Sequence, residues 1–511
     1  MNKKHTPILF IFVFIKFTLQ YLAINPVYEL HRDEFLHLDQ GKHLAWGYLS
    51  VPPVTSWFSY IIILLGNNEF WVKFFPALFG VLTLIIVWHA IKILKGNLFA
   101  LVLGASAVTF STLVRMNTLY QPNSFEIMIW TLFFYSLIRF FNSGNNKWIL
   151  ITGFIIGIAF LNKYNIVFVL IALIPAIIIS RQAKIFVNKY FYFALLIALV
   201  IISPNLYWQY QHHFVVFHHL STLSKTQLVN VNRIDFIKEQ MLFFAGSIFI
   251  LIASFFSFFT FPFFKKYITI FWCLVFTLAI FIFLKAKGYY AIGLYPIFFA
   301  FGSVYLERIF QAKAGVLLRP LSLIIILVFF IVTIKIILPV MSPEEIIADP
   351  KILKKIGLMR WEDGKDHMIP QDFADMVGWK ELAQKVDSCY SLEPDKEHTA
   401  VLCNNYGQAG AINYYSKYKN INAVTQNADY IDWYKLDIPI LNVISVKTFG
   451  DKDSLRKNEK PYFDSIKYMG EIKNPFSREK GTNIYLFKKP KIDINSILRK
   501  EIANTKKEDS E

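Results

Sequence analysis

Acidic residues are scarce in the first two thirds of the chain. Residues 1–340 contain nine Asp or Glu against 26 Lys or Arg, whereas residues 341–511 contain 27 of each kind. The formal net charge of +17 therefore belongs entirely to the first part. Lys and Arg between apolar runs typically set the orientation of a membrane protein, and no basic face or nucleic-acid recognition motif accompanies them here. We expect membrane lipids as partners and no nucleic acid.

Cysteine is also rare, with three residues whose spacing matches no metal-binding motif. Cys273 lies in an apolar run and is expected to pack there. Cys389 and Cys403 lie in the polar tail, where they could form a disulfide if the tail is exported or remain two buried thiols. The pairs His212–His213 and His218–His219 could bind zinc, but no third ligand stands at a diagnostic spacing. The sequence assigns no certain cofactor and leaves a divalent metal possible.

Long apolar runs are abundant instead. The chain is 55% hydrophobic with a mean hydropathy of +0.42, above the roughly 45–50% apolar content of soluble domains. A helix needs roughly 20 apolar residues to cross a bilayer, and fewer when flanking residues snorkel. The sequence predicts about eleven transmembrane helices, near residues 7–24, 70–91, 97–114, 123–140, 148–161, 164–180, 191–207, 241–262, 267–284, 289–306 and 320–340. Asn162 and Lys163 predict a tight turn between the two shortest. No cleavage site follows the first run, which indicates an uncleaved anchor.

The positions of Lys and Arg predict the orientation of these helices. If the N-terminus is cytoplasmic, fourteen Lys or Arg, with Lys3 and Lys4 among them, fall in short inner loops and ten fall in longer outer loops. This asymmetry follows the positive-inside rule. Eleven spans then place the tail outside. The two long loops, 25–69 and 208–240, lie on the same outer face, where we expect the chemistry.

The composition divides the chain into two domains. Residues 1–340 form the transmembrane domain, and its first outer loop, 25–69, is expected to carry interfacial helices on either side of Pro52–Pro53. Residues 341–511 are sufficient for one small soluble α/β domain. Strand-like runs ("HTAVLCN", "IPILNVISV", "NIYLF") alternate there with helix-like ones ("FADMVGWKELAQKVDSCY", "YGQAGAINYYSKY"). The last stretch, "RKEIANTKKEDSE", is expected to fray.

Four of the nine acids of the first part lie within eleven positions, directly after the first apolar run: Glu29, Asp33, Glu34 and Asp39. The Asp33–Glu34 pair could cap the N-terminus of a helix, where a carboxylate offsets exposed amides and the dipole. A carboxylate with restricted solvation also has a raised pKa and can act as a general base. We predict this catalytic role for Asp33, with Glu34 as a second candidate, and expect Asp39 and Glu29 to be surface groups.

Polar side chains also gather at the outer ends of the predicted spans. Lys and Arg there commonly snorkel to the surface, but ionisable residues at membrane depth are also candidates for function. Cations can hold a phosphate, with Arg as a bidentate fork and Lys as a point charge. Glu126 stands inside an apolar span, either as a site residue or as the partner of Arg115. The substrate-binding candidates are Arg115, Glu126, Lys163, Tyr164, Lys287 and Tyr290.

The residues alone therefore indicate an outward-facing membrane site with a carboxylate base and several cations. A transferase in which the base activates a hydroxyl and an anionic phosphate departs would fit this site. A membrane transporter or flippase for a lipid-linked or anionic substrate would also fit. Inverted repeats would favour a transporter, and the sequence shows none.

Several segments resemble a known family. "HRDEFLHLDQGKHLAWGYLSVPPVTSW" is similar to the first outer loop of the glycosyltransferase 39, or protein mannosyltransferase-like, group of GT-C enzymes. "RMNTLYQPNSFEIMIWTL" resembles the second outer loop of the group, which often has Asp where this chain has Glu126. "LNKYN", "KGYYAIGLYP" and "NNYGQAGAINYY" resemble further elements of the group. The resemblance covers nearly the whole chain.

The resemblance implies a GT-C fold and an inverting hexosyl or pentosyl transfer from a polyprenyl-phosphate sugar to a lipid, glycan or protein acceptor. It places Asp33 at the position of the group's catalytic acidic residue, which serves as the base for the acceptor hydroxyl. It also implies that the protein lies in the inner membrane of a bacterium, with the tail in the periplasm. One departure is visible. Relatives that transfer aminoarabinose to lipid A carry Glu-Lys before Pro-Pro, where this chain has Ser50–Val51, which argues against that activity and its metal site.

Overall fold

The computed structural model describes residues 5–226, 231–450, 453 and 456–508. Lys3 and Lys4, assigned above to the inner face, lie outside the described residues. The chain divides into two compact units. The first unit comprises residues 1–23, 51–55 and 70–338, and the second comprises residues 24–50, 56–69 and 339–511. The first outer loop thus belongs mainly to the same unit as the C-terminal region.

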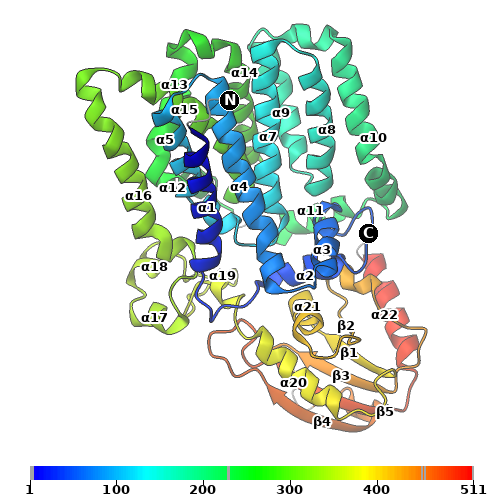
Figure 1. Ribbon diagram of the computed structural model, residues 1–511. Helices are drawn as coiled ribbons and strands as arrows, with labels where there is room; N and C mark the ends of the chain where they lie inside the picture. Colours follow the sequence, from blue (N-terminus) through cyan, green and yellow to red (C-terminus); the bar gives the residue numbers. More distant parts are fainter. Residues whose placement is uncertain (1–4, 227–230, 451–452, 454–455, 509–511) are drawn as a thin grey trace. The chain divides into compact units, whose positions relative to one another are not determined.

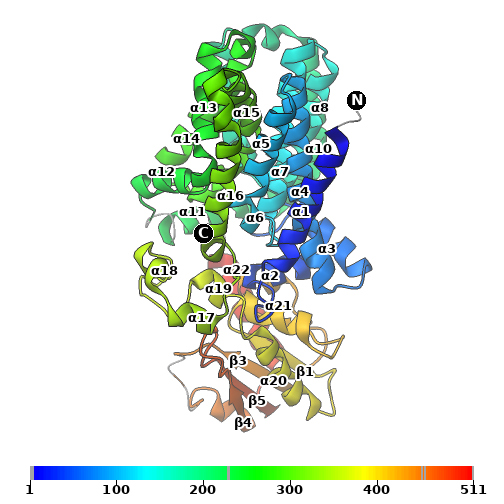
Figure 2. The same cartoon turned by 60° about the vertical axis from the view of Figure 1, so that its left-hand side comes forward.

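The first unit is built of long apolar helices that lie side by side (Figures 1 and 2). An apolar helix stands at each of the eleven positions predicted from the sequence: α1 (Thr6–Leu22), α4 (Glu69–Ile93), α5 (Leu98–Thr109), α7 (Pro122–Ser143), α8 (Lys147–Asn162), α9 (Ile166–Ile179), α10 (Lys189–Gln211), α13 (Ile248–Thr260), α14 (Ile268–Phe283), α15 (Pro296–Ile309) and α16 (Leu318–Ile337). The predicted polytopic helical membrane fold is therefore confirmed. The tight turn after Asn162 is confirmed as well, because α8 ends there and α9 begins at Ile166.

These helices differ in how far they can reach across a bilayer. In the described part of the chain, five stretches are long and apolar enough to cross it unaided: Glu69–Ile93, Pro122–Ser143, Lys189–Gln211, Pro262–Phe283 and Gly315–Ile337. Two bent pairs pass the same test, namely α12 (Arg233–Leu242) with Ala245–Thr260, bent by 60°, and η6 (Gly288–Leu294) with α15, bent by 53°. Helices α1, α5, α8 and α9 are shorter. That all eleven cross the membrane stays a prediction.

Small residues allow the closest helix contacts of the first unit. A Cβ atom added to Gly153 in α8 would stand 2.3 Å from the Ala194 carbonyl oxygen of α10, and one added to Gly302 in α15 would stand 2.0 Å from the Ile250 carbonyl oxygen of α13. Lipid provides no hydrophobic force between helices, so van der Waals contact between closely spaced backbones has to hold them together. The short elements α6 (Leu113–Met116) and α11 (Val215–Thr226) complete the described helices of this unit.

The second unit contains a five-stranded mixed sheet of order β2-β1-β3-β5-β4. Strand β1 (Thr399–Cys403) is parallel to β2 (Ala423–Val424) and β3 (Asn442–Lys447), whereas β5 (Asn483–Pro490) is antiparallel to β3 and to β4 (Phe463–Glu471). Helix α20 (Trp379–Ser391) contacts β3, β4 and β5, and α21 (Tyr406–Tyr415) follows β1 and contacts it. The remaining helices are α2 (Arg32–Gln40), α3 (Val54–Leu64), across which the division between the units falls, α17 (Pro343–Ala348), α18 (Lys351–Lys355), α19 (Gln371–Ala374) and α22 (Ile494–Glu508).

The core of the second unit follows the alternation of side chains along its strands. Val443 of β3 and Phe487 of β5 are paired and pack with Ile494 and Leu498 of α22 in one buried cluster. The predicted small α/β domain is confirmed, although the sequence analysis did not identify β2 and β4. We expected the last stretch, from residue 499, to fray. This was wrong for residues 499–508, because α22 continues to Glu508.

Candidate functional site

The Asp33–Glu34 pair lies in the first turn of α2, whose N-terminus is closed by a capping box. The backbone N–H of His31 donates to Glu34 Oε2 at 2.6 Å, and the Asp33 N–H donates to Nδ1 of His31 at 3.2 Å. Glu34 is buried. Of the two roles that the sequence allowed for this pair, Glu34 therefore has the capping role: its carboxylate accepts the backbone N–H at the start of the helix.

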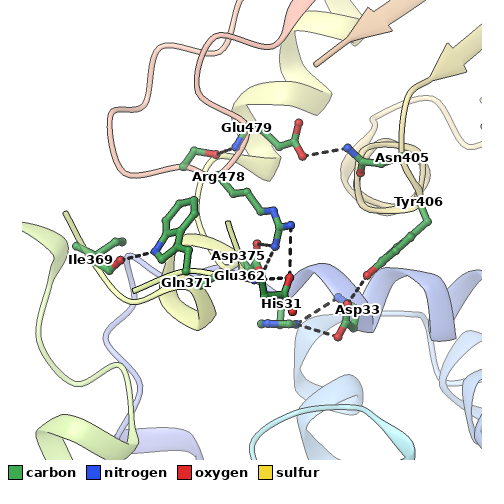
Figure 3. Close-up of polar contacts among 12 residues, drawn as sticks. His31, Asp33, Glu362, Ile369, Gln371, Asp375, Asn405, Tyr406, Arg478 and Glu479 are labelled. Atoms are coloured by element: carbon green, nitrogen blue, oxygen red, sulfur yellow. Dashed lines mark hydrogen bonds and ion pairs between the residues drawn. The ribbon is translucent and has the colours of Figure 1, made fainter. Parts of the chain in front are cut away.

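Asp33 has a different environment from Glu34. Its side chain is 41% exposed, and its Oδ1 accepts a hydrogen bond of 2.7 Å from the hydroxyl of Tyr406 at the start of α21 (Figure 3). Burial acts to raise the pKa of this carboxyl, but the nearby His31, the Tyr406 hydrogen bond and the Arg32 charge together lower it below its usual value. Our expectation of a raised pKa was wrong in sign, because these favourable charges outweigh the desolvation. The group is an accessible carboxylate, ionised at neutral pH.

Side chains from the C-terminal region surround this carboxylate. The guanidinium of Arg32 lies 4.2 Å from the centre of the Tyr406 ring. The backbone N–H of Arg32 donates to the backbone carbonyl of Asp375. Asp375 in turn forms an ion pair with Arg478 at 3.1 Å (Figure 3). Burial raises the pKa of the Asp375 carboxyl, against the charges of His31 and Arg478. The sequence analysis assigned no role to Arg32, Asp375 or Arg478, since nothing in the local pattern joins positions so far apart.

Asp39 and Glu29 are structural anchors, so the expectation that they are surface groups was wrong. Asp39 is 4% exposed, and its Oδ2 accepts from the hydroxyl of Tyr430 and from Nδ2 of Asn413, both at 2.8 Å. Glu29 Oε2 accepts the backbone N–H of Trp379 at 2.6 Å, at the N-terminus of α20. Both carboxylates join the first outer loop to the C-terminal region.

In the first unit, three of the predicted substrate-binding residues lie together. Lys163 Nζ donates to Glu126 Oε2 at 2.9 Å and lies 4.6 Å from the centre of the Tyr290 ring. It also donates to Asn123 Oδ1 at 2.8 Å. Glu126 is thus the partner of Lys163, and in the described residues it forms no ion pair with Arg115. The start of α7, the turn before α9 and η6 therefore meet at one end of this unit.

The other candidates of the first unit have separate surroundings. The Tyr164 hydroxyl donates to Asn205 Oδ1 at 3.2 Å and accepts from Gln209 Nε2 at 2.9 Å, so this side chain ties the start of α9 to α10. Arg115 is buried in α6. Lys287 lines a pocket of about 340 Å³ together with Asp235 and Glu239. Glu126, Lys163 and Tyr290 thus lie together, whereas the Tyr164 hydroxyl contacts α10.

A metal centre does not fit the side chains that the structure describes. No group of three or more His, Cys, Asp or Glu residues stands together in the described ranges. The His212–His213 and His218–His219 pairs are therefore not joined by a third ligand there. No step of the chemistry considered below is routed through a metal.

Comparisons with known proteins agree with this architecture. Residues 50–208 match the model of the family PMT_2, described as dolichyl-phosphate-mannose-protein mannosyltransferase. The chain is 22% identical over 205 residues to the lipid A galacturonosyltransferase RgtD of Rhizobium johnstonii, an alignment that covers 39% of this chain and 42% of the relative. The chain thus matches less than half the length of this curated relative.

Two solved structures share the fold over nearly the whole chain. The structure of ArnT from Cupriavidus metallidurans bound to undecaprenyl phosphate aligns with a TM-score of 0.63 at 13% identity, and covers 95% of this chain and 98% of that one. The apo structure of the same protein aligns with a TM-score of 0.60 at 12% identity, over 94% and 98% of the two chains. At such low identity the likeness shows an ArnT-like GT-C fold.

Proposed function

We propose that the chain, whose residues 50–208 match the PMT_2 family model and which has an ArnT-like GT-C fold, is a glycosyltransferase that uses a polyprenyl-phosphate sugar. The sugar passes with inversion to a hydroxyl of the acceptor. One observation carries the proposal: Asp33 offers an ionised, partly exposed carboxylate at a fixed position, held by the hydroxyl of Tyr406.

Asp33 acts in this proposal as the general base. It accepts the proton of the acceptor hydroxyl while the hydroxyl oxygen attacks the anomeric carbon of the donor. A bond forms between that oxygen and the anomeric carbon, and the bond from the same carbon to the phosphate oxygen breaks. A single displacement of this kind inverts the configuration. A lowered pKa keeps the base ionised over a wide pH range.

The leaving polyprenyl phosphate is anionic, so fixed cations can stabilise it electrostatically. Lys163, with Glu126 and Tyr290 around it, and the cations Arg115 and Lys287 are the proposed contacts for the donor. Tyr164 supports this set by fixing the start of α9 on α10. The Lys163–Glu126 ion pair means that Lys163 has to share its charge with Glu126 when it binds a phosphate.

A lipid is the proposed acceptor class. The relative from Rhizobium johnstonii is a lipid A galacturonosyltransferase, and the ArnT structure contains bound undecaprenyl phosphate. Both support a reaction between two membrane-bound substrates. We place the protein in a bacterial inner membrane with a cytoplasmic N-terminus and with residues 341–511 in the periplasm, in keeping with the distribution of Lys and Arg.

The test uses purified protein with a panel of polyprenyl-phosphate sugars and measures the release of polyprenyl phosphate. We expect turnover by the wild type. In Asp33→Asn we expect turnover to fall by at least about a hundredfold, because a general base typically contributes that much or more to the rate. Equal turnover in the two proteins would remove Asp33 from the mechanism. Absence of turnover with every donor, together with substrate flux into liposomes, would favour a transporter.

A further inference from the structure

The second unit contains a crevice outside the region around Asp33. It has a volume of about 920 Å³ and lies against the sheet and α22. A neighbouring pocket of about 530 Å³ shares Leu402 and Tyr434 with it. The volume of the larger pocket is within the range typical of small-molecule sites.

The position of the crevice follows from the topology of the sheet. Its wall includes Cys403 and Asn404 at the carboxyl end of β1, residues 425–427 directly after β2, and Val446 and Lys447 at the end of β3. From the central strand β1 the chain goes to β2 on one side and afterwards to β3 on the other. In open α/β sheets, ligands bind outside the carboxyl ends of the strands at such a switch point.

The side chains that line the crevice identify the chemistry of a ligand. Its polar groups are mainly side-chain amides and hydroxyls, namely Asn404, Gln426, Asn427, Asn458, Ser445 and Tyr462. Among the described lining residues the one cation is Lys447, which lies 3.7 Å from Glu459, and Glu501 adds a second carboxylate. This charge balance disfavours a phosphate, while side-chain amides both donate to and accept from hydroxyl groups and carboxylates accept from them.

Part of the hydrogen-bonding capacity of this wall is unused. Glu459 Oε2 is buried and has no hydrogen-bond partner among the described residues. Asn404 Oδ1 accepts the Thr448 N–H at 3.1 Å, while its Nδ2 makes no hydrogen bond in the described structure. Tyr462 is 48% exposed, so its ring offers a flat apolar surface. A buried acceptor without a partner costs free energy unless something binds it.

We propose that this crevice binds a saccharide, the glycan part of the acceptor. A sugar ring offers hydroxyl groups to the amides and carboxylates and an apolar C–H face to Tyr462. Asn404 lies two residues before Tyr406, whose hydroxyl contacts Asp33, so the β1–α21 connection carries both a residue of the crevice wall and the residue that holds the proposed base. The identification of the saccharide as acceptor rests on the proposed function.

The test is direct binding of the full-length protein in detergent to a printed array of bacterial surface glycans, without donor. We expect the wild type to retain a defined group of glycans, and Tyr462→Ala and Asn404→Asp to weaken that binding by about tenfold or more. Asn404→Asp keeps an oxygen that can accept from Thr448, replaces the Nδ2 donor by an acceptor and adds a negative charge. Tyr468→Ala is the matched control, because Tyr468 is similarly exposed, at 52%, and is not part of the crevice wall.

Two results would overturn the proposal: no glycan retained by the wild type, or retention that is unchanged in both crevice variants. Binding is measured without a donor, so it is independent of the transfer reaction. A protein that retains glycans and lacks turnover would contradict the proposed function alone. If the protein has turnover but its glycan binding is unchanged in both crevice variants, this inference alone is contradicted.

Discussion

The hydroxyl of Tyr406 donates a hydrogen bond of 2.7 Å to Oδ1 of Asp33, across 373 positions of the sequence. The bond orients Oδ1 of the carboxylate, while Oδ2 lies 4.0 Å from Nδ1 of His31. Because a hydrogen bond to the ionised form lowers the pKa of a carboxyl, Tyr406 both positions the proposed base and keeps it unprotonated. In the proposed mechanism, the C-terminal region therefore supplies a residue that positions the base.

Tyr406→Phe is expected to shift the pH dependence of turnover. Removing the hydroxyl raises the pKa of Asp33, and because the base works in its ionised form, the acidic limb of the kcat/KM profile moves to higher pH. We expect a shift of about half to one pH unit, since water replaces part of the lost bond. The charges that remain near the carboxyl are those of His31, Arg32, His37 and Asp375.

The control for that shift is Tyr468→Phe, which removes an exposed hydroxyl from β4 and should leave the profile unchanged. A Tyr406→Phe profile that merely drops in height, with no movement of its acidic limb, would mean that Tyr406 acts through structure alone.

Glu34 and Asp33 are expected to respond differently to loss of charge. Glu34→Gln keeps an oxygen that can accept the His31 N–H, so helix α2 and turnover should both persist. Glu34→Ala removes the cap and should lower the free energy of unfolding by about 1 kcal/mol. Thermal unfolding in detergent and the turnover assay measure the two effects. Loss of turnover in a stable Glu34→Gln protein would instead show a chemical role for Glu34.

Asp39→Ala is expected to destabilise the second unit. The buried carboxylate accepts from Tyr430 and Asn413, and its removal takes the acceptor from the Tyr430 hydroxyl and leaves Asn413 Nδ2 with the Ala423 carbonyl. Bonds to charged groups contribute about 1.5–3 kcal/mol each, so we expect loss of the two bonds to cost about 3–6 kcal/mol. In limited proteolysis, the second unit of the Asp39→Ala variant should be cleaved faster than that of the wild type. Asp464→Asn, which removes an exposed pair with Lys491, is the control and should change little. Equal protection in the two variants would contradict the anchoring role of Asp39.

Lys163 and Glu126 are expected to show strong coupling. Both side chains are largely buried, at 17% and 5% exposure, and loss of one member of a buried ion pair costs about 3–5 kcal/mol. Lys163→Met should therefore lower thermal stability markedly, and adding Glu126→Gln should restore much of it. If Lys163 contacts the donor phosphate, the restored double variant still has a raised KM for the donor. Additive effects on stability would mean that the two charges do not interact.

The sequence predicted those features that depend on local pattern. Apolar runs located the helices, and Asn162 with Lys163 located the turn between α8 and α9, because both depend on neighbours within one helix length. The burial of Asp39 could not be predicted, since its partners Tyr430 and Asn413 are more than 370 positions away. The direction of the pKa shift of Asp33 was missed partly for the same reason: His31 and Arg32, which lower this pKa, are neighbours in the sequence, but the Tyr406 hydroxyl, which also lowers it, lies in α21.

Strands β2 and β4 were missed for different reasons. Strand β2 has two residues and too short a pattern to recognise, and β4 is mostly exposed, with its single buried end at Phe463. Neither has the apolar run that marked the central strands. For Glu126 the sequence left two roles open, a site residue or the partner of Arg115, and the structure pairs it with Lys163 instead.

The hydrogen bond between Asp33 and Tyr406 also sets an order of events during synthesis. A ribosome adds about 5–20 residues per second, so the 373 residues that separate the two positions take about 20–75 s to make. Throughout that interval the first loop has left the ribosome without the partners that bury Asp39 and hold Asp33. The proposed catalytic carboxylate therefore acquires its Tyr406 partner only after residue 406 has been translated, and a shorter chain carries the base without that partner.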